Sequence, residues 1–512
     1  VIAVSASFAH ALPATPHWFD QKVDHFSTSG ATFKQRYYVH TEHFGGPGSP
    51  IFVIMGGEGG IPPEVGFYYP WVVEVLAKKF QALVLEPEHR FYGASLPWGE
   101  DSFTQERLQV MNTQQALADT AHFIRSQQGD FNCTKRGTAG YCPVHTIGGS
   151  YPGFLSAMMR LRYPAVVDSA HAASAPIRFY AQQVDQYAYY TKVTESAERS
   201  FAGCPHAVLS AFLTMEAYMR NATADDIAQH FSLCTPLPEG RAAGKDQLAD
   251  NLLFLAEQTF ANLNMANYPP DNKTGLYKAC ASFVAAASQG GQEGALDAMR
   301  SLLLSTSLSS SSKLASGRAY FQTAVAAERP LGESCFNLQK QLPAGQSATA
   351  RCGDWSGCGA GHDGEMWDYQ TCTFEVEQIG FGSAAQMFPT RRWSKEWLQN
   401  HCRQRFGVSP QPLALAELWG LEDSDLRAQT SRIVFTNGLN DGWSVGGILE
   451  DLAPEKGLLA INLPNGAHHS ELSHSYGQSD TPDVQAAHAQ IIEVLGRWLL
   501  EVKDASPCEV HV

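Results

Sequence analysis

Three side chains with complementary chemistry each follow a predicted strand: Ser150, Asp441 and His468. A neutral serine hydroxyl is a weak nucleophile, so an imidazole must remove its proton during attack. A carboxylate can fix the tautomer of that imidazole and stabilise the imidazolium that forms. Because parallel strands end at the same edge of a sheet, the three residues are expected to converge there. This combination predicts acyl transfer through a covalent intermediate on Ser150, with Asp441 and His468 as its partners.

Ser150 lies between a short apolar strand at 144–147 and a helix at 154–163. The local pattern is G-x-S-x-P, so Pro152 stands where the strict nucleophile pattern has a second glycine. A serine on a tight strand-to-helix turn is held in a strained backbone conformation and presented to solvent. The free N–H groups of the following helix point at the oxyanion that forms, which makes the Tyr151 N–H an expected donor.

A glycine-rich segment follows the apolar strand at 50–55, with Glu58 in its middle. Glycine lets backbone N–H groups approach a substrate closely, so Gly57 is the expected second oxyanion donor. Gly56 and a nearby side chain are alternatives for that donor, and an ordinary glycine-rich turn competes with both. From spacing alone, His469 also competes with its neighbour as the catalytic base.

The composition restricts the classes of partner. The chain has 512 residues, 44% of them apolar and 17% charged, with a formal net charge of −15. A nucleic-acid partner requires a basic face, so none is expected. No apolar run beyond the N-terminus is long enough to span a bilayer, so no membrane partner is expected. The eleven cysteines form no CxxC pair or zinc-type spacing, and neither a metal nor a cofactor is predicted.

Several features favour the secretory pathway, where disulfides form. Three glycosylation sequons begin at Asn132, Asn221 and Asn272. Residues 1–11 resemble the end of a signal peptide, and a disordered tail is the alternative. Buried thiols of a cytosolic enzyme are the alternative to disulfides. The spacing of Cys133 and Cys142 allows a local disulfide, and the odd cysteine count makes Cys508 the candidate unpaired thiol.

Strands alternate with helices near both ends of the chain, which predicts a parallel, doubly wound sheet. The middle contains long helical stretches and eight of the eleven cysteines. We therefore expect an α/β-hydrolase core with an inserted helical, disulfide-rich cap domain over the carboxyl end of the sheet. After the tail at 1–11, the expected boundaries are 12–180 for the first part of the core, 181–425 for the cap and 426–512 for the second part.

Longer motifs around these residues resemble those of the S28 serine peptidases, the family of prolyl carboxypeptidases and dipeptidyl peptidase 7. The resemblance rests on the segments 23–26, 86–97, 148–151, 437–443 and 466–469. It implies cleavage of peptides after proline, usually at acidic pH, by an α/β-hydrolase core with a helical cap. It also implies that the first histidine of the pair, His468, is the base.

Segments 356–361 and 367–373 look most like the dipeptidyl peptidase branch. That likeness implies that Asp368 binds the α-amino group of the substrate, with Glu58 assisting; a helix-capping or surface carboxylate is the alternative. Trp367 and Trp443 are candidate walls around a prolyl ring, and core packing competes with this role.

The expected activity is therefore that of a serine exopeptidase that releases X-Pro dipeptides from the N-terminus of peptides. The alternatives are a prolyl carboxypeptidase or endopeptidase of the same family, an esterase on the same fold, and a non-catalytic binding protein on a hydrolase scaffold. The expected partners are proline-containing peptides, and a homodimer is left open. The expected location is extracellular or in a lysosome or vacuole.

Overall fold

A computed structural model describes residues 12–234, 245–310, 335–338, 352–382, 386–473 and 480–504. The expected signal-peptide remnant at 1–11 and the unpaired Cys508 lie outside these ranges.

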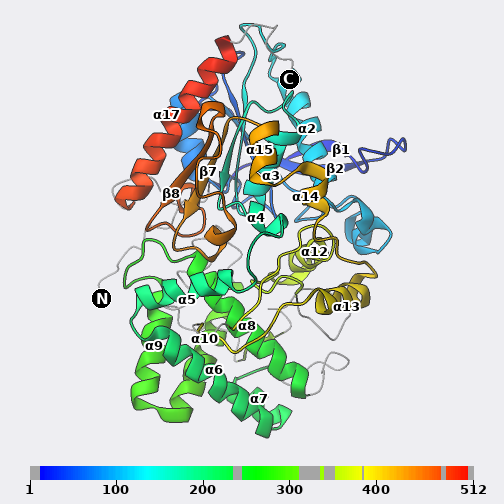
Figure 1. Cartoon of the computed structure of the whole chain (residues 1–512). Helices are drawn as coiled ribbons and strands as arrows, with labels where there is room; N and C mark the ends of the chain where they lie inside the picture. The colour runs from blue at the N-terminus through cyan, green and yellow to red at the C-terminus, as the bar shows by residue number, and fades with distance from the viewer. Residues whose placement is uncertain are drawn as a thin grey trace.

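An eight-stranded sheet forms the centre of the molecule, in the order β1-β2-β4-β3-β5-β6-β7-β8 (Figure 1). Its strands are β1 His17–Lys22, β2 Thr32–His40, β3 Ile51–Ile54, β4 Leu83–Pro87, β5 Val144–Gly149, β6 Ser169–Ala173, β7 Ile433–Gly438 and β8 Leu458–Leu463. The strands from β3 to β8 are parallel, as expected, but β1 and β2 are antiparallel to their neighbours. The expected parallel sheet is confirmed for β3 to β8, and β1 and β2 add an antiparallel edge to it. The short connection from β1 to β2 permits a hairpin, whereas a parallel pair needs a long crossover.

The central strands are buried on both faces, which explains their continuous apolar sequences. One face packs against α2 (Thr113–Asp130) and α3 (Tyr151–Arg162). The other packs against α1 (Ala77–Phe80) and the C-terminal helix α17 (Pro482–Asp504), which crosses the left side of Figure 1. The tightly packed sheet gives a rigid platform for residues at its strand ends.

Between β6 and β7 the chain forms a mainly helical region on one side of the sheet (Figure 1). Its helices are α4 Ile177–Tyr180, α5 Ala188–Ser200, α6 Cys204–Asn221, α7 Ala224–His230, α8 Lys245–Met265, α9 Gly275–Gln289, α10 Gly291–Ser310, α12 Gly361–Thr371, α13 Lys395–Phe406, α14 Ala414–Trp419 and α15 Asp423–Gln429. Helices α5, α6, α8, α9 and α10 share a hydrophobic core of their own. We refer to α5–α13 as the cap.

Disulfides are concentrated in this helical region, as expected. The pairs are Cys133–Cys142, Cys204–Cys280, Cys234–Cys335, Cys352–Cys358 and Cys372–Cys402. The local disulfide between Cys133 and Cys142 is the one that the sequence suggested. The other four lie in the cap, where they cross-link segments as far as 101 residues apart.

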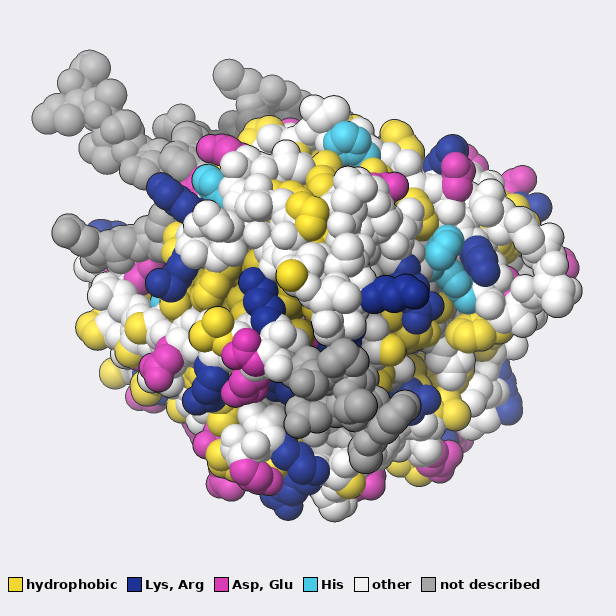
Figure 2. Space-filling view, turned by 90° about the horizontal axis from the view of Figure 1, so that it is seen from above, with side chains coloured by type: hydrophobic (Ala, Val, Ile, Leu, Met, Phe, Trp, Pro, Cys, Tyr) yellow, Lys and Arg dark blue, Asp and Glu magenta, His cyan; other side chains and the backbone are white. Residues whose placement is uncertain are grey.

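The surface carries both signs of charge. In Figure 2, Lys and Arg side chains are interspersed with Asp and Glu side chains and with apolar ones on the face seen from above. Within the described part of the chain, no helix combines the length and the apolar character that crossing a membrane requires.

Candidate active site

Strand β5 ends next to Ser150, and α3 begins at the following residue. Ser150 has φ 65° and ψ −134°, a conformation that residues with a side chain rarely adopt. The surrounding structure holds it there: the Ser150 N–H donates to the Ala173 carbonyl at 2.8 Å, and its own carbonyl accepts from the Phe154 N–H at 3.0 Å. Ser150 is thus fixed at the sharp strand-to-helix turn expected of a nucleophile.

The positions that require glycine explain why proline is tolerated in this turn. A Cβ on Gly148 would lie 2.2 Å from the Pro152 carbonyl oxygen, and a Cβ on Gly153 would lie 2.6 Å from the Ala173 carbonyl oxygen. The close approach of α3 to β6 therefore falls at Gly153, one residue later than in the strict pattern. Pro152 occupies the first turn of α3, where its missing N–H leaves no helical hydrogen bond unmade.

Asp441 and His468 form a close carboxylate–imidazole pair. The Asp441 Oδ2 lies 2.6 Å from the His468 Nδ1, and the Asp441 side chain is fully buried. The other carboxylate oxygen accepts from the Trp443 N–H at 3.1 Å, which fixes its orientation. Because a carboxylate accepts hydrogen bonds, the His468 Nδ1 must carry the proton, and Nε2 is left to accept one. A base in this tautomer is what proton removal from a serine requires.

The cap holds the two loops that carry this pair. The Ser196 hydroxyl and the Asn264 side-chain amide both donate to the Asn440 carbonyl at 2.7 Å. The Asn264 amide oxygen also accepts from the Gly442 N–H at 2.8 Å. On the second loop, the His468 N–H donates to the carbonyl of Met265, the last residue of α8, at 3.2 Å. The insertion therefore helps to position both loops.

His469 has surroundings that differ from those of its neighbour. A Cβ on Gly149 would lie 2.6 Å from the His469 Cγ, so the imidazole packs directly against the end of β5. Burial, together with the positive charge that His468 can carry, lowers the pKa of His469 to about 3. His469 is therefore neutral and packs against the end of β5, and the close contact with Asp441 belongs to His468. This geometry favours His468 as the base.

The Tyr151 side chain is held by His89 and Trp367. The His89 Nδ1 lies 2.7 Å from the Arg90 carbonyl and must donate to it, so its Nε2 accepts from the Tyr151 hydroxyl at 3.1 Å. Burial lowers the pKa of His89 to about 4, in keeping with a neutral ring. The Trp367 ring packs edge-on against Tyr151 at 5.4 Å. The side chain is thereby anchored, and the Tyr151 N–H remains at the start of α3.

Trp443 forms an aromatic wall beside the His468 ring, which lies 6.3 Å away. Tyr189 and Phe179 extend this wall, with ring centroids 4.9 and 5.4 Å from Trp443. The second candidate wall residue, Trp367, is 6% exposed and donates from Nε1 to Asp354 at 3.0 Å. Both tryptophans are mostly buried, so each also contributes to packing.

The surroundings of Asp368 differ from those of a residue that contacts substrate. Its carboxylate oxygens lie 2.9 Å from the His401 Nε2 and 2.9 Å from the Arg405 Nε, and one oxygen also accepts from the Gly353 N–H at 2.7 Å. The side chain is inaccessible to solvent. These contacts join α12 to α13, so the geometry favours a role in holding the cap together over binding of a substrate amine.

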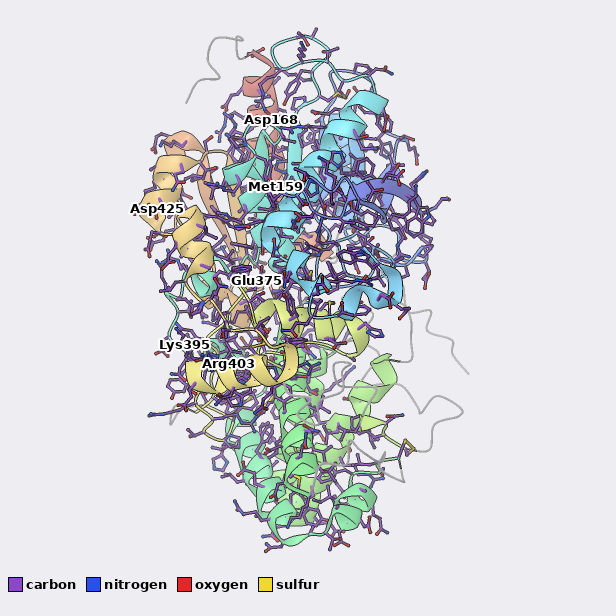
Figure 3. All side chains as sticks on the ribbon, turned by 90° about the vertical axis from the view of Figure 1, so that its right-hand side faces the viewer. Met159, Asp168, Glu375, Lys395, Arg403 and Asp425 are labelled. Atoms are coloured by element: carbon purple, nitrogen blue, oxygen red, sulfur yellow. A yellow bond between two sulfur atoms is a disulfide. The ribbon has the colours of Figure 1, made fainter. Side chains whose placement is uncertain are left out.

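One other acidic side chain, Glu58, lies near the base. Glu58 is half-buried; burial raises its pKa, while the nearby His468 lowers it. Asp354 lies near Glu58 and next to Glu377, and burial raises the pKa of both residues. Asp354 and Glu377 were not predicted as site residues from the sequence, although Asp354 lies next to the motif from which Asp368 was predicted. Figure 3 labels the neighbouring Glu375 between α3 and α13, at the junction of sheet and cap.

Among the described residues, three groups of His, Cys, Asp or Glu side chains have ligand atoms close enough together to hold a metal ion. Two of the three groups found contain cysteines that form disulfides, which removes them as thiolate ligands. The third consists of His40, Glu42 and His43 at the end of β2. That end of β2 pairs with the start of β4, far along the sheet from the strand ends described above.

The three sequon asparagines, Asn132, Asn221 and Asn272, are all exposed. An attached glycan could therefore be accommodated at each of them without unfolding the protein.

Comparison with known proteins agrees with this architecture. The family model described as serine carboxypeptidase S28 matches residues 21–491. Lysosomal Pro-X carboxypeptidase from Mus musculus is 28% identical over 490 residues, covering 94% of this chain and 89% of that protein. Thymus-specific serine protease from Homo sapiens is 28% identical over 509 residues, covering 97% and 89%. The family match spans nearly the whole chain, including the Ser150 turn and the Asp441–His468 pair, and this protein belongs to the S28 family of serine peptidases.

Proposed function

We propose that this S28 peptidase cleaves after proline and releases N-terminal X-Pro dipeptides through an acyl-enzyme on Ser150. The observation that carries the proposal is the 2.6 Å contact between Asp441 and His468, formed at strand ends of the sheet that also presents the strained Ser150. The family match supports peptide hydrolysis, and the relatives named Pro-X carboxypeptidase support proline as the recognised residue.

In the proposed mechanism, His468 Nε2 takes the proton of the Ser150 hydroxyl as the serine oxygen attacks the carbonyl carbon of the proline residue. Asp441 stabilises the imidazolium that forms. The N–H groups of Tyr151 and Gly57 bind the oxyanion of the tetrahedral intermediate. His468 then protonates the leaving amine, the C–N bond breaks, and the dipeptide remains as an ester on Ser150. A water molecule activated by His468 hydrolyses this ester and restores the enzyme.

Recognition of proline is assigned to Trp443, with the fully buried Tyr189 and Phe179 packed behind it. A prolyl ring is apolar and lacks an N–H, so flat apolar walls bind it without leaving a donor unpaired. Trp443 follows Asp441 by two residues and packs near His468, which places the wall next to the reacting groups.

The charge of the neighbouring side chains supports recognition of a free amino terminus. Glu58 and Asp354 are both acidic. The Glu58 carboxyl group interacts electrostatically with His468 and with Asp354. Carboxylates bind a substrate ammonium through charge-assisted hydrogen bonds. They would repel the C-terminal carboxylate that a carboxypeptidase must bind close to the scissile bond.

A carboxypeptidase acting on Pro-X bonds is the second candidate, and the names of the relatives favour it. Dipeptide release is tested by hydrolysis of alanyl-proline p-nitroanilide and its N-acetyl derivative over a range of pH, and the carboxypeptidase is tested by release of the last residue from an N-acetylated peptide that ends in Pro-X. We expect strong preference for the free amine; equal hydrolysis of both substrates would refute dipeptide release. Hydrolysis of simple esters without preference for proline would instead support an esterase.

The proposed location is the lysosome, vacuole or extracellular space. Five disulfides and three exposed sequons fit the secretory pathway, and several relatives are named as lysosomal. Sensitivity of the secreted or organelle-purified protein to an N-glycosidase tests this, since a glycan-free protein recovered from the cytosol would contradict it.

A further inference from the structure

Glu377 is a buried carboxylic acid next to the proposed amine-binding residues. It lies in the segment after α12 and is 2% exposed. Its neighbours are the Asp354 carboxyl group and the Tyr180 hydroxyl, and it is near enough to Glu58 to feel its charge. Three acidic side chains therefore interact with one another, and one of them, Glu58, also interacts with His468.

The hydrogen bonding of these acids is unequal. Asp354 accepts from the Ser356 N–H at 2.7 Å, from the Ser356 hydroxyl at 2.8 Å and from the Trp367 Nε1 at 3.0 Å. Neither carboxyl oxygen of Glu377 accepts a hydrogen bond of good geometry from any described residue, although Tyr180 is close. Leaving a buried carboxyl group without donors is costly, and a buried negative charge in that state is more so.

A ligand with several N–H donors and a positive charge would remove this cost. A primary ammonium carries three N–H donors, and the amino terminus of a peptide is such a group. Asp354 already accepts three hydrogen bonds from protein groups. The carboxyl oxygens of Glu377 can still accept hydrogen bonds from a ligand. An ammonium between the two carboxyl groups would also offset the repulsion between their negative charges.

We propose that Glu377 is a specificity-determining residue that binds the N-terminal ammonium of the substrate, together with Asp354. The inference rests on the proposed release of dipeptides and deepens it, because it names the group that reads the free amine. Glu377 thereby selects substrates with an unmodified amino terminus and takes no part in the chemistry at Ser150.

The test compares kcat/KM for alanyl-proline p-nitroanilide and its N-acetyl derivative in Glu377→Gln and Glu377→Met. The amide keeps the shape of the side chain without its charge, and methionine needs no hydrogen-bond donor, which makes it the better-folding second variant. Losing a hydrogen bond between charged groups is expected to lower kcat/KM for the free amine by about 10- to 100-fold. The slow hydrolysis of the acetylated substrate should stay unchanged, so the ratio of the two constants falls.

Glu257→Gln is the matched control. Glu257 is also a buried acid of the cap, 2% exposed, but it forms an ion pair with Arg391 at 3.3 Å. Its substitution should lower thermal stability and leave the ratio of the two rate constants unchanged. A fall in the ratio for this control would show that any loss of a buried acid loosens the site, which would overturn the assignment to Glu377.

Two different failures can be told apart. If wild-type enzyme hydrolyses both substrates equally well, the proposed dipeptide release is wrong and the role of Glu377 falls with it. If wild-type enzyme prefers the free amine and both Glu377 variants retain that preference within about twofold, the proposed function stands and the inference about Glu377 is refuted.

Discussion

Gly57 and Pro152 are in direct contact, so that a Cβ built on Gly57 would lie 2.3 Å from the Pro152 Cγ and 2.9 Å from its Cδ. This contact joins the glycine-rich segment after β3 to the first turn of α3. Each segment supplies one of the two N–H groups proposed to bind the oxyanion. The spacing between those donors thus depends on the absence of a side chain at Gly57 and on the ring of Pro152.

Gly57→Ala should consequently widen the oxyanion site. Overpacking of this kind costs ~1–3 kcal/mol, and we expect kcat/KM to fall at least about tenfold. The same Cβ would lie 3.8 Å from the Pro152 Cβ, an ordinary contact. The double variant Gly57→Ala/Pro152→Ala should therefore recover activity relative to Gly57→Ala. Steady-state kinetics on the p-nitroanilide checks this; a double variant no better than the single one would contradict the steric account.

Asp441→Asn should lower kcat strongly while changing KM little. The amide can donate to the His468 Nδ1 and so favours the wrong tautomer, an effect of about 10⁴-fold in a serine peptidase of another fold. Asp423→Asn serves as control, because Asp423 forms a half-exposed ion pair with Arg178 away from the site. Single-turnover measurements locate the defect; a loss confined to KM would argue that Asp441 acts in binding.

The buried carboxyl group of Glu375 should make the thermal stability of the protein depend on pH. Burial raises its pKa from 4.5 to about 8, so it is protonated in the folded protein over most of the acidic range. When folding raises the pKa of an acid, the group stabilises the folded protein fully at pH values below its pKa in the unfolded chain. This stabilisation is lost as the pH rises through the pKa in the folded protein. Thermal stability should therefore decline between about pH 4.5 and 8.

Glu375→Gln should make that decline shallower, because the amide does not ionise. The difference between the two proteins is expected to reach a few kcal/mol near neutral pH. Thermal unfolding followed by circular dichroism at several pH values measures it, with the exposed Glu501→Gln as control. Parallel curves for wild type and Glu375→Gln would show that this group does not titrate in the window.

Asp368 and Asp354 should respond differently to the same chemical change. Asp368→Asn removes the negative charge that faces the buried Arg405 and His401 and should cost ~3–5 kcal/mol of stability. It should leave the preference for a free amine unchanged. Asp354→Asn should reduce that preference. Melting temperatures and the ratio of free to acetylated kcat/KM separate the two roles; a lost preference in Asp368→Asn would restore Asp368 as the amine contact.

The strand ends could be predicted because their residues carry local signals. Apolar runs at 50–55, 144–147 and 458–463 each precede a glycine or a polar group, and all three form parallel strands. The antiparallel hairpin of β1 and β2 was not predicted, because β1 is mostly exposed and its sequence is polar and aromatic. Its pairing depends on the partner strand more than on its own pattern.

The roles of Asp354 and Asp368 could not be assigned from the sequence for a different reason. Asp354 lies just before the motif that contains Asp368, and both side chains are almost completely buried. What distinguishes them is tertiary: α13 brings Arg405 and His401 to Asp368, whereas Glu377 and Trp367 reach Asp354. Likewise, Pro152 looked like a defect in the pattern until the crossing of α3 and β6 placed the required glycine at 153.

The acyl group carried by Ser150 during turnover tests the central claim most directly. A short peptide with proline at its second position and again before its last residue offers both modes of cleavage. The enzyme is quenched in acid during turnover, and the fragment containing Ser150 is examined by mass spectrometry. Dipeptide release predicts an X-Pro ester on Ser150. An ester of the peptide lacking only its C-terminal residue would show a carboxypeptidase, and an acyl group on any residue other than Ser150 would contradict the proposed mechanism.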